Sequence, residues 1–160
     1  MLHNKKRSNQ IDNIYDETNA CIDGLEFIEN LYEISGVVIN TDSLPGYLNM
    51  YANEARYCYA HNLFIGSIAL CRTMIELCLN EIYRNKNIPE VPLVEAYEKS
   101  SFDLIEYLFH DNQSTKKRLH RLRIKLNGYV HGQPKNIKEE MKKIYLETIN
   151  CINEIYDANS

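Results

Sequence analysis

Three polar residues, Arg123, Asn127 and His131, follow one another at four-residue steps in a helix that the sequence predicts over 114–131. Each step turns an α-helix by only about 40° and climbs about 6 Å, so the three side chains share one slowly winding stripe. A neutral imidazole can remove the proton from a ribose 2′-hydroxyl, while a guanidinium stabilises charge on the phosphate oxygens. The spacing therefore fits cleavage of RNA without a metal. Arg123 and His131 are then the catalytic pair, and Asn127 orients the histidine or holds a phosphate oxygen.

A structural role explains the same end of the helix. Gly132 follows His131, and a glycine at this position often ends a helix in the left-handed conformation. A protonated histidine in the last turn is favoured by the negative end of the helix dipole. The spacing alone leaves both the catalytic site and the structural cap open.

The same predicted helix concentrates positive charge in a chain whose formal net charge is −4. An acidic protein has no general affinity for nucleic acid, so any such contact must come from a local basic surface. The candidate RNA- and phosphate-binding residues are Lys116, Lys117, Arg118, Arg121 and Lys125, with His120 among them. A solvated helix face is the alternative explanation for this run.

Two charged residues, Arg72 and Glu76, interrupt the most apolar stretch of the chain, LFIGSIALCRTMIELCL over 63–79. Charges inside a membrane span are costly, so a buried central helix explains this stretch better, and we expect no membrane partner. Because an unpaired buried ion is also costly, the two residues should form an ion pair within the helix, at the edge of the fold. Alternatively, they support the candidate site, with Glu76 orienting Arg72 or Arg123.

The five cysteines are odd in number and lack the close pairing of zinc or redox motifs. They are Cys21, Cys58, Cys71, Cys78 and Cys151, and each lies within a helical apolar pattern. No glycine-rich phosphate loop is present either. We therefore expect a cytoplasmic protein with free thiols, no metal site and no cofactor.

Apolar residues recur at helical spacing along almost the whole chain, which predicts an all-α fold. Short connections between amphipathic helices favour an antiparallel bundle of five to six helices in a single domain over 1–160, with residues 1–8 as a flexible polar N-terminus. The predicted helices cover 11–34, 44–59, 63–84, 93–109 with an interruption near Ser100 and Ser101, 114–131 and 137–156. The first carries one apolar stripe: Ile11, Ile14, Tyr15, Cys21, Ile22, Leu25, Ile28 and Tyr32. Ser43 is a plausible cap for the second, ahead of Pro45.

Two segments resemble a known family. The segment EARYCYAHNLFIGSIALCRTMIELCLNEIY over 54–83, followed by LRIKLNGYVHG over 122–132, resembles the HEPN superfamily of helical bundles, and in particular its uncharacterised branch from bacterial defence and restriction loci. That branch shows an EA…C…A…RxxxE helix pair and then an LRxxxNxxxHG helix end. The matching residues are Glu54, Ala55, Cys58, Arg72, Glu76, Leu122, Arg123, Asn127, His131 and Gly132. The resemblance covers about residues 44–156.

The resemblance implies a homodimer in which two copies of the 114–131 helix meet at their ends, and the twelve tyrosines also suit an interface. Many members of the superfamily are metal-independent ribonucleases that act as toxins or antiviral effectors. By this resemblance Arg123 binds phosphate, His131 is catalytic and Asn127 fills the polar position of the motif. Active members usually have a shorter interval between arginine and histidine, and Gln133 stands where one subgroup has tyrosine. A non-catalytic module that binds a nucleotide, RNA or an operon-encoded partner protein is therefore the alternative.

Overall fold

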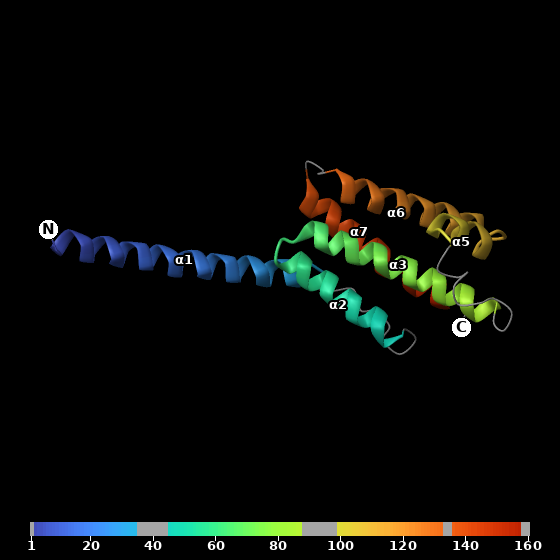
Figure 1. The fold of residues 1–160 in the computed structure, drawn as a ribbon, viewed down its shortest axis with the longest axis horizontal. Helices are drawn as coiled ribbons and strands as arrows, with labels where there is room; N and C mark the ends of the chain where they lie inside the picture. The colour runs from blue at the N-terminus through green and yellow to red at the C-terminus, as the bar shows by residue number, and fades with distance from the viewer. Residues whose placement is uncertain (1, 35–44, 88–98, 133–135, 158–160) are drawn as a thin grey trace.

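The described part of the chain folds into α-helices that pack side by side, apart from a long arm at the N-terminal end (Figure 1). A computed structural model describes residues 2–34, 45–87, 99–132 and 136–157, and those ranges contain six helices and no strand. The helices are α1 (Leu2–Ile34), α2 (Gly46–Ala60), α3 (Phe64–Asn87), α5 (Ser101–Leu108), α6 (Gln113–His131) and α7 (Ile137–Asp157). The predicted all-α bundle is confirmed.

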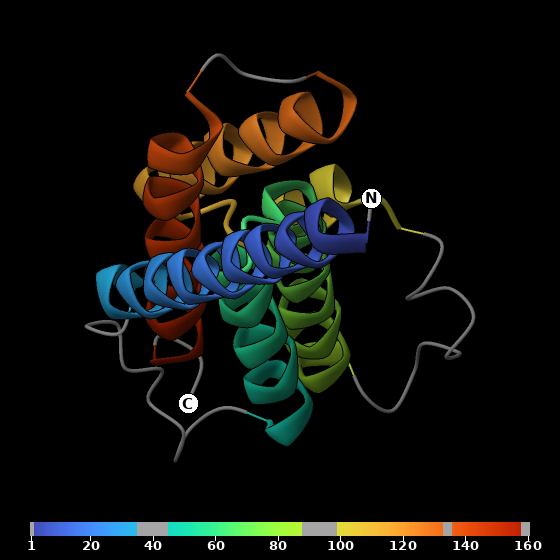
Figure 2. The same cartoon turned by 90° about the vertical axis from the view of Figure 1, so that its left-hand side faces the viewer.

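Helix α3 is the central element of the bundle. It contacts α2, α5, α6 and α7, and Figures 1 and 2 show these helices around it. Its buried apolar side chains point in several directions: Ile68, Cys71, Met74, Ile75, Cys78, Leu79, Ile82 and Tyr83. The apolar stretch over 63–79 is thus a buried helix, as the sequence predicts. No helix in the described ranges is both long and apolar enough to cross a membrane.

Helix α6 rests on α3 through one face. Leu119, Leu122 and Leu126 are at most 1% exposed, while Val130 is partly buried against the same core. On α7 an apolar stripe is buried from Met141 to Ile155, with Ile144, Tyr145 and Ile152 between them. These two apolar faces fix the rotation of α6, and so they determine which of its polar residues reach solvent.

Side-chain caps start the two helices that carry most of the candidate site. The Ser100 hydroxyl accepts a hydrogen bond from the Asp103 backbone at 3.2 Å and begins α5, close to the predicted interruption. The Asn112 side chain accepts from the Thr115 backbone at 3.1 Å and begins α6. Residues 93–98 of the predicted 93–109 helix lie outside the described residues, as does the predicted cap Ser43.

Helix α1 extends away from the bundle as a long arm (Figure 1). It begins at Leu2 and so includes most of the 1–8 segment for which the sequence predicts a flexible terminus. Neither glycine nor proline occurs between residues 2 and 23, so nothing in the sequence interrupts the helix there. Its last turns are held against the bundle: Ile34 is buried, and the Asn30 amide donates to the Ala60 carbonyl at 3.2 Å.

The contact between α6 and α3 is expected to dominate the stability of the site helix. Replacing Leu122 with alanine leaves a cavity beside α3 and should lower the free energy of unfolding by about 2–5 kcal/mol. Ile124 on the same helix is 62% exposed, so Ile124→Ala is the matched control and should change stability by less than about 0.5 kcal/mol. Urea unfolding followed by circular dichroism measures both. Equal losses in the two variants would contradict this packing.

Candidate functional site

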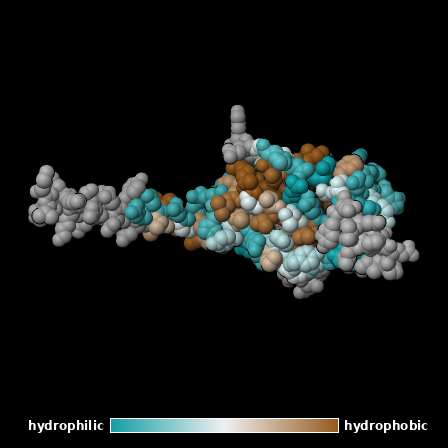
Figure 3. Space-filling model, viewed as in Figure 1, coloured by the Kyte–Doolittle hydropathy of each residue, from teal (hydrophilic) through white to brown (hydrophobic). Residues whose placement is uncertain are grey.

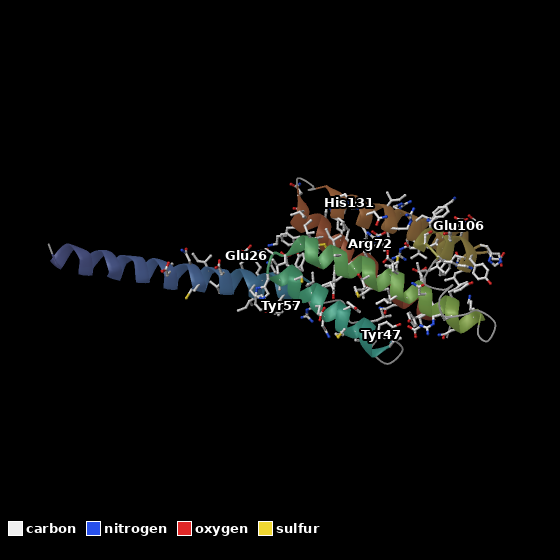
Figure 4. The ribbon with its side chains drawn as sticks, viewed as in Figure 1. Glu26, Tyr47, Tyr57, Arg72, Glu106 and His131 are labelled. Carbon is white, nitrogen blue, oxygen red and sulfur yellow. The ribbon has the colours of Figure 1, made fainter. Side chains whose placement is uncertain are left out.

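The three residues of the predicted catalytic stripe lie on α6 with different degrees of exposure. Arg123 and Asn127 are half-buried beside the leucine face, and His131 is exposed as the last residue of the helix. Because the leucines fix the rotation of α6, the two half-buried side chains lie at the border between the core and solvent. Figure 4 shows His131 toward the end of the bundle from which α1 extends.

The guanidinium of Arg123 lies over an aromatic ring on α5. Its central carbon is 5.5 Å from the centroid of the Phe102 ring, a cation–π distance, and the His120 ring is 4.8 Å from the same centroid. His131 is eight residues further along α6, or about 12 Å along the axis. Helical side chains lean toward the N-terminus, so this contact directs Arg123 away from His131. The structure places both residues on one helix but does not bring their functional groups together.

Two neighbouring polar atoms of the stripe are buried without a partner. Among the described residues, neither the Arg123 Nε nor the Asn127 Oδ1 has a hydrogen bond. One is a donor and the other an acceptor, on side chains four residues apart that are neighbours on a helix surface. A buried polar atom without a partner costs about 1–3 kcal/mol. A ligand, or a small rotation that pairs the two side chains, would recover this energy.

The N-terminal half of α6 is partly neutralised by Glu106 of α5. The Glu106 carboxylate accepts from the Lys116 Nζ at 2.5 Å, and it pairs with the His120 Nε2 at 2.8 Å. The hydrogen bond from Lys116, followed by that from His120, holds the pKa of Glu106 below its ordinary value. Figure 4 shows Glu106 toward the opposite end of the bundle from His131.

Two further basic residues of α6 have carboxylate partners on α7. Arg118 pairs with Glu154, and Lys125 pairs with Glu147 at 3.3 Å. Within the described residues, Lys117 and Arg121 have no ion pair, and both are exposed. The positive surface available to a phosphate is therefore smaller than the sequence predicts, and its centre lies at these two side chains.

The charged pair on α3 forms the predicted ion pair. The Arg72 Nε donates to the Glu76 Oε1 at 2.9 Å, and the two side chains are 40% and 38% exposed. The two residues line a groove of about 400 Å³ between α3 and α5, together with Lys99. Lys99 donates from Nζ to the Tyr83 hydroxyl at 2.6 Å. The intrahelical ion pair is confirmed, and no direct contact joins it to Arg123 among the described interactions.

The end of α6 differs from the expected glycine cap. Gly132 has φ −146° and ψ 140°, an extended conformation that any residue adopts, instead of the left-handed one. A side chain added there would lie 3.4 Å from the Gly128 carbonyl oxygen. The left-handed form of the structural cap is absent, whereas His131 keeps its position in the last turn.

Three of the five thiols are buried in the core. Burial raises the pKa of Cys71 to about 12 and that of Cys151 to about 11, and it raises the pKa of Cys78 as well. Cys21 is exposed on α1, and Cys58 is half-buried. Within the described ranges, no three His, Cys, Asp or Glu residues lie close enough together to hold a metal ion.

No family model matches the chain, and no curated protein or solved structure matches it. The resemblance to the HEPN superfamily therefore rests on the motif residues in the sequence. A helical bundle alone is compatible with many functions.

The sequence patterns did not identify Glu106, Phe102 and Lys99 as parts of the site. Phe102 and Glu106 are four residues apart, so they share one face of a short helix, and this spacing was the available signal. Their role depends on how α5 is turned toward α6, and the spacing alone does not give that orientation.

The ion pairs of Glu106 predict a specific dependence of stability on pH. Since its pKa is below the ordinary 4.5, Glu106 stabilises the fold above pH 4.5 and loses that contribution as the pH falls through the lowered value. The wild type should therefore be more stable than Glu106→Gln near neutrality, and the difference should disappear in acid. Urea midpoints over this pH range measure it. Asp23→Asn, on the exposed side of α1, is the control, and a difference that does not vary with pH would contradict the prediction.

Proposed function

We propose that this protein is a HEPN-like, metal-independent endoribonuclease that acts as a cytoplasmic homodimer. The resemblance in the motif residues suggests a role as an RNA-directed effector of a bacterial toxin or antiphage defence system. The observation that carries the proposal is the α6 stripe, in which an exposed imidazole at His131 follows two side chains with partnerless buried polar atoms, Arg123 and Asn127.

In the proposed reaction His131 acts as the general base. It removes the proton from a ribose 2′-hydroxyl, the 2′-oxygen attacks the adjacent phosphorus, and the 5′-oxygen leaves and takes up a proton. Arg123 stabilises the negative charge on the phosphate oxygens once its guanidinium turns from Phe102 toward the substrate. Asn127 lies between the two on the helix, where its side chain can hold Arg123 or a phosphate oxygen.

The proposal predicts RNA cleavage that persists in EDTA and depends on His131. His131→Ala should lower the cleavage rate by about 10²–10⁴, the usual contribution of a general base, and Arg123→Ala should lower it similarly. Single-stranded and structured RNA labelled at the 5′ end provide the assay. His110→Ala is the matched control, because His110 is an exposed histidine in the connection between α5 and α6, at the opposite end of α6 from His131.

Two results would end the nuclease proposal: no cleavage by the wild type, or equal cleavage by His131→Ala. Toxicity on expression in bacteria, relieved by His131→Ala and not by His110→Ala, would extend the result to the cell. If Arg123→Ala leaves every cellular phenotype intact, a role in assembly becomes the better explanation.

A non-catalytic module that binds RNA, a nucleotide or an operon-encoded partner protein is the second candidate. The contact between Arg123 and Phe102 favours it, because this contact keeps the guanidinium away from His131. Carboxylates on α5 and α7 also hold three of the basic residues in place. Such a module would use Lys117 and Arg121 to hold phosphate without turnover.

Binding through this surface predicts a clear dependence on salt. The double variant Lys117→Ala/Arg121→Ala should bind single-stranded RNA more weakly, and the slope of log K against log salt should fall by about 0.7 for each phosphate that the variant no longer neutralises. Fluorescence anisotropy at several salt concentrations measures both quantities. Lys86→Ala, an exposed lysine on α3, should leave them unchanged. Unaltered binding by the double variant would exclude this surface.

A further inference from the structure

Helix α1 presents an apolar face that the bundle does not cover. Ile22, Leu25, Ile28 and Tyr32 are 54–82% exposed. Figure 3 shows hydrophobic residues among hydrophilic ones along α1 where it leaves the bundle. Buried Ile34 lies nine residues after Leu25, and at about 100° per residue the two face opposite sides of the helix. The exposed face is therefore a second surface, separate from the one that attaches α1 to the bundle.

The exposed face follows a heptad repeat. Thr18, Cys21, Leu25, Ile28 and Tyr32 are separated by alternating steps of four and three residues, and the sequence continues the same pattern backward through Ile14 and Ile11. This is the spacing of the a and d positions in a coiled coil, sustained over three heptads. In an isolated helix the side chains at these positions stay exposed to water, whereas a second helix with the same pattern can bury them.

The charges of α1 indicate how a second copy would pair with it. The first turns contain Lys5, Lys6 and Arg7 in sequence, whereas the remainder contains only acidic charges. The acidic residues are Asp12, Asp16, Glu17, Asp23, Glu26, Glu29 and Glu33. A parallel pair would place like charges level with one another along the whole helix, while an antiparallel pair places the basic first turns of each helix level with the acidic last turns of the other. The acidic majority also opposes docking on an anionic membrane surface.

We propose that α1 is a dimerisation arm that forms an antiparallel coiled coil with α1 of a second copy of this chain. The register that sets a positions against d positions places Thr18 opposite the partner's Cys21. The inference rests on the proposed function only in taking the chain to be a homodimer; it places the contact at α1 instead of at the ends of α6, and it does not depend on ribonuclease activity.

Mass measurement by light scattering after gel filtration tests whether the exposed apolar face of α1 forms the dimer contact. The wild type should have twice the 18.7 kDa mass of one chain, and Leu25→Glu/Ile28→Glu should have the mass of a single chain. Ile124→Glu is the matched control, because Ile124 is 62% exposed on α6, and it should remain dimeric. Circular dichroism checks that the bundle is folded in each variant.

Cysteine cross-linking tests the direction and the register. Cys21 is exposed, while Cys71, Cys78 and Cys151 are buried. In the antiparallel register Thr18→Cys lies opposite the partner's Cys21, so mild oxidation should give a covalent dimer. The covalent dimer should disappear when Cys21→Ser is added. Efficient cross-linking of the wild type through Cys21 alone would indicate a parallel pair and overturn the proposed arrangement.

The outcomes separate this inference from the proposed function. A wild type with the mass of one chain overturns both the α1 pairing and the homodimer, while the EDTA cleavage assay still decides the nuclease activity. A dimer that survives Leu25→Glu/Ile28→Glu overturns the α1 pairing alone and leaves the homodimer to another surface. The dimerisation arm is supported if the dimer dissociates only in Leu25→Glu/Ile28→Glu and if Thr18→Cys gives the predicted cross-link to Cys21.

Discussion

Helix α3 is apolar on nearly all sides, and the burial of its side chains organises the rest of the structure. A helix of this kind must be surrounded, and α2, α5, α6 and α7 all contact it. The leucines of α6 are buried in that contact, so Arg123 and Asn127 can lie only at its border. The position of the candidate site therefore follows from core packing. The chemistry at the site depends on the few polar groups that this packing leaves near solvent.

Ion pairs reduce the positive charge that α6 presents to solvent. Lys116 and His120 share the Glu106 carboxylate, and Arg118 and Lys125 each have a partner on α7. These ion pairs join α6 to α5 and α7, so part of the basic run has a structural role. Each exposed ion pair contributes little to stability. Together, however, these pairs reduce the local positive potential that a phosphate would meet. Lys117 and Arg121 then become the residues that distinguish a nucleic-acid surface from a structural one.

The sequence predicted the helices well, because a 3.6-residue apolar period directly records which residues share a face. It did not predict that Glu106 would pair with Lys116, since that pairing depends on how two helices are turned toward each other. It also did not show that the apolar stripe of α1 would be exposed. Periodicity identifies residues on one face and gives no information about what covers that face, so only the fold reveals that Leu25 and Ile28 are exposed.

The proposed arm has a consequence for the candidate site. In the antiparallel register the two-fold axis passes near residues 19 and 20, and Ile34, where α1 joins the bundle, lies about 22 Å from it along the helix. The two bundles would then lie on opposite sides of the axis, about 40 Å apart, so this pairing does not bring the two α6 ends together. The resemblance to the HEPN superfamily implies a dimer in which those ends meet. If each chain makes both the α1 contact and the contact between α6 ends, dimers formed through α1 would associate further through α6. If it makes only the α1 contact, Arg123 must turn from Phe102 for it to act with Asn127 and His131 within one subunit.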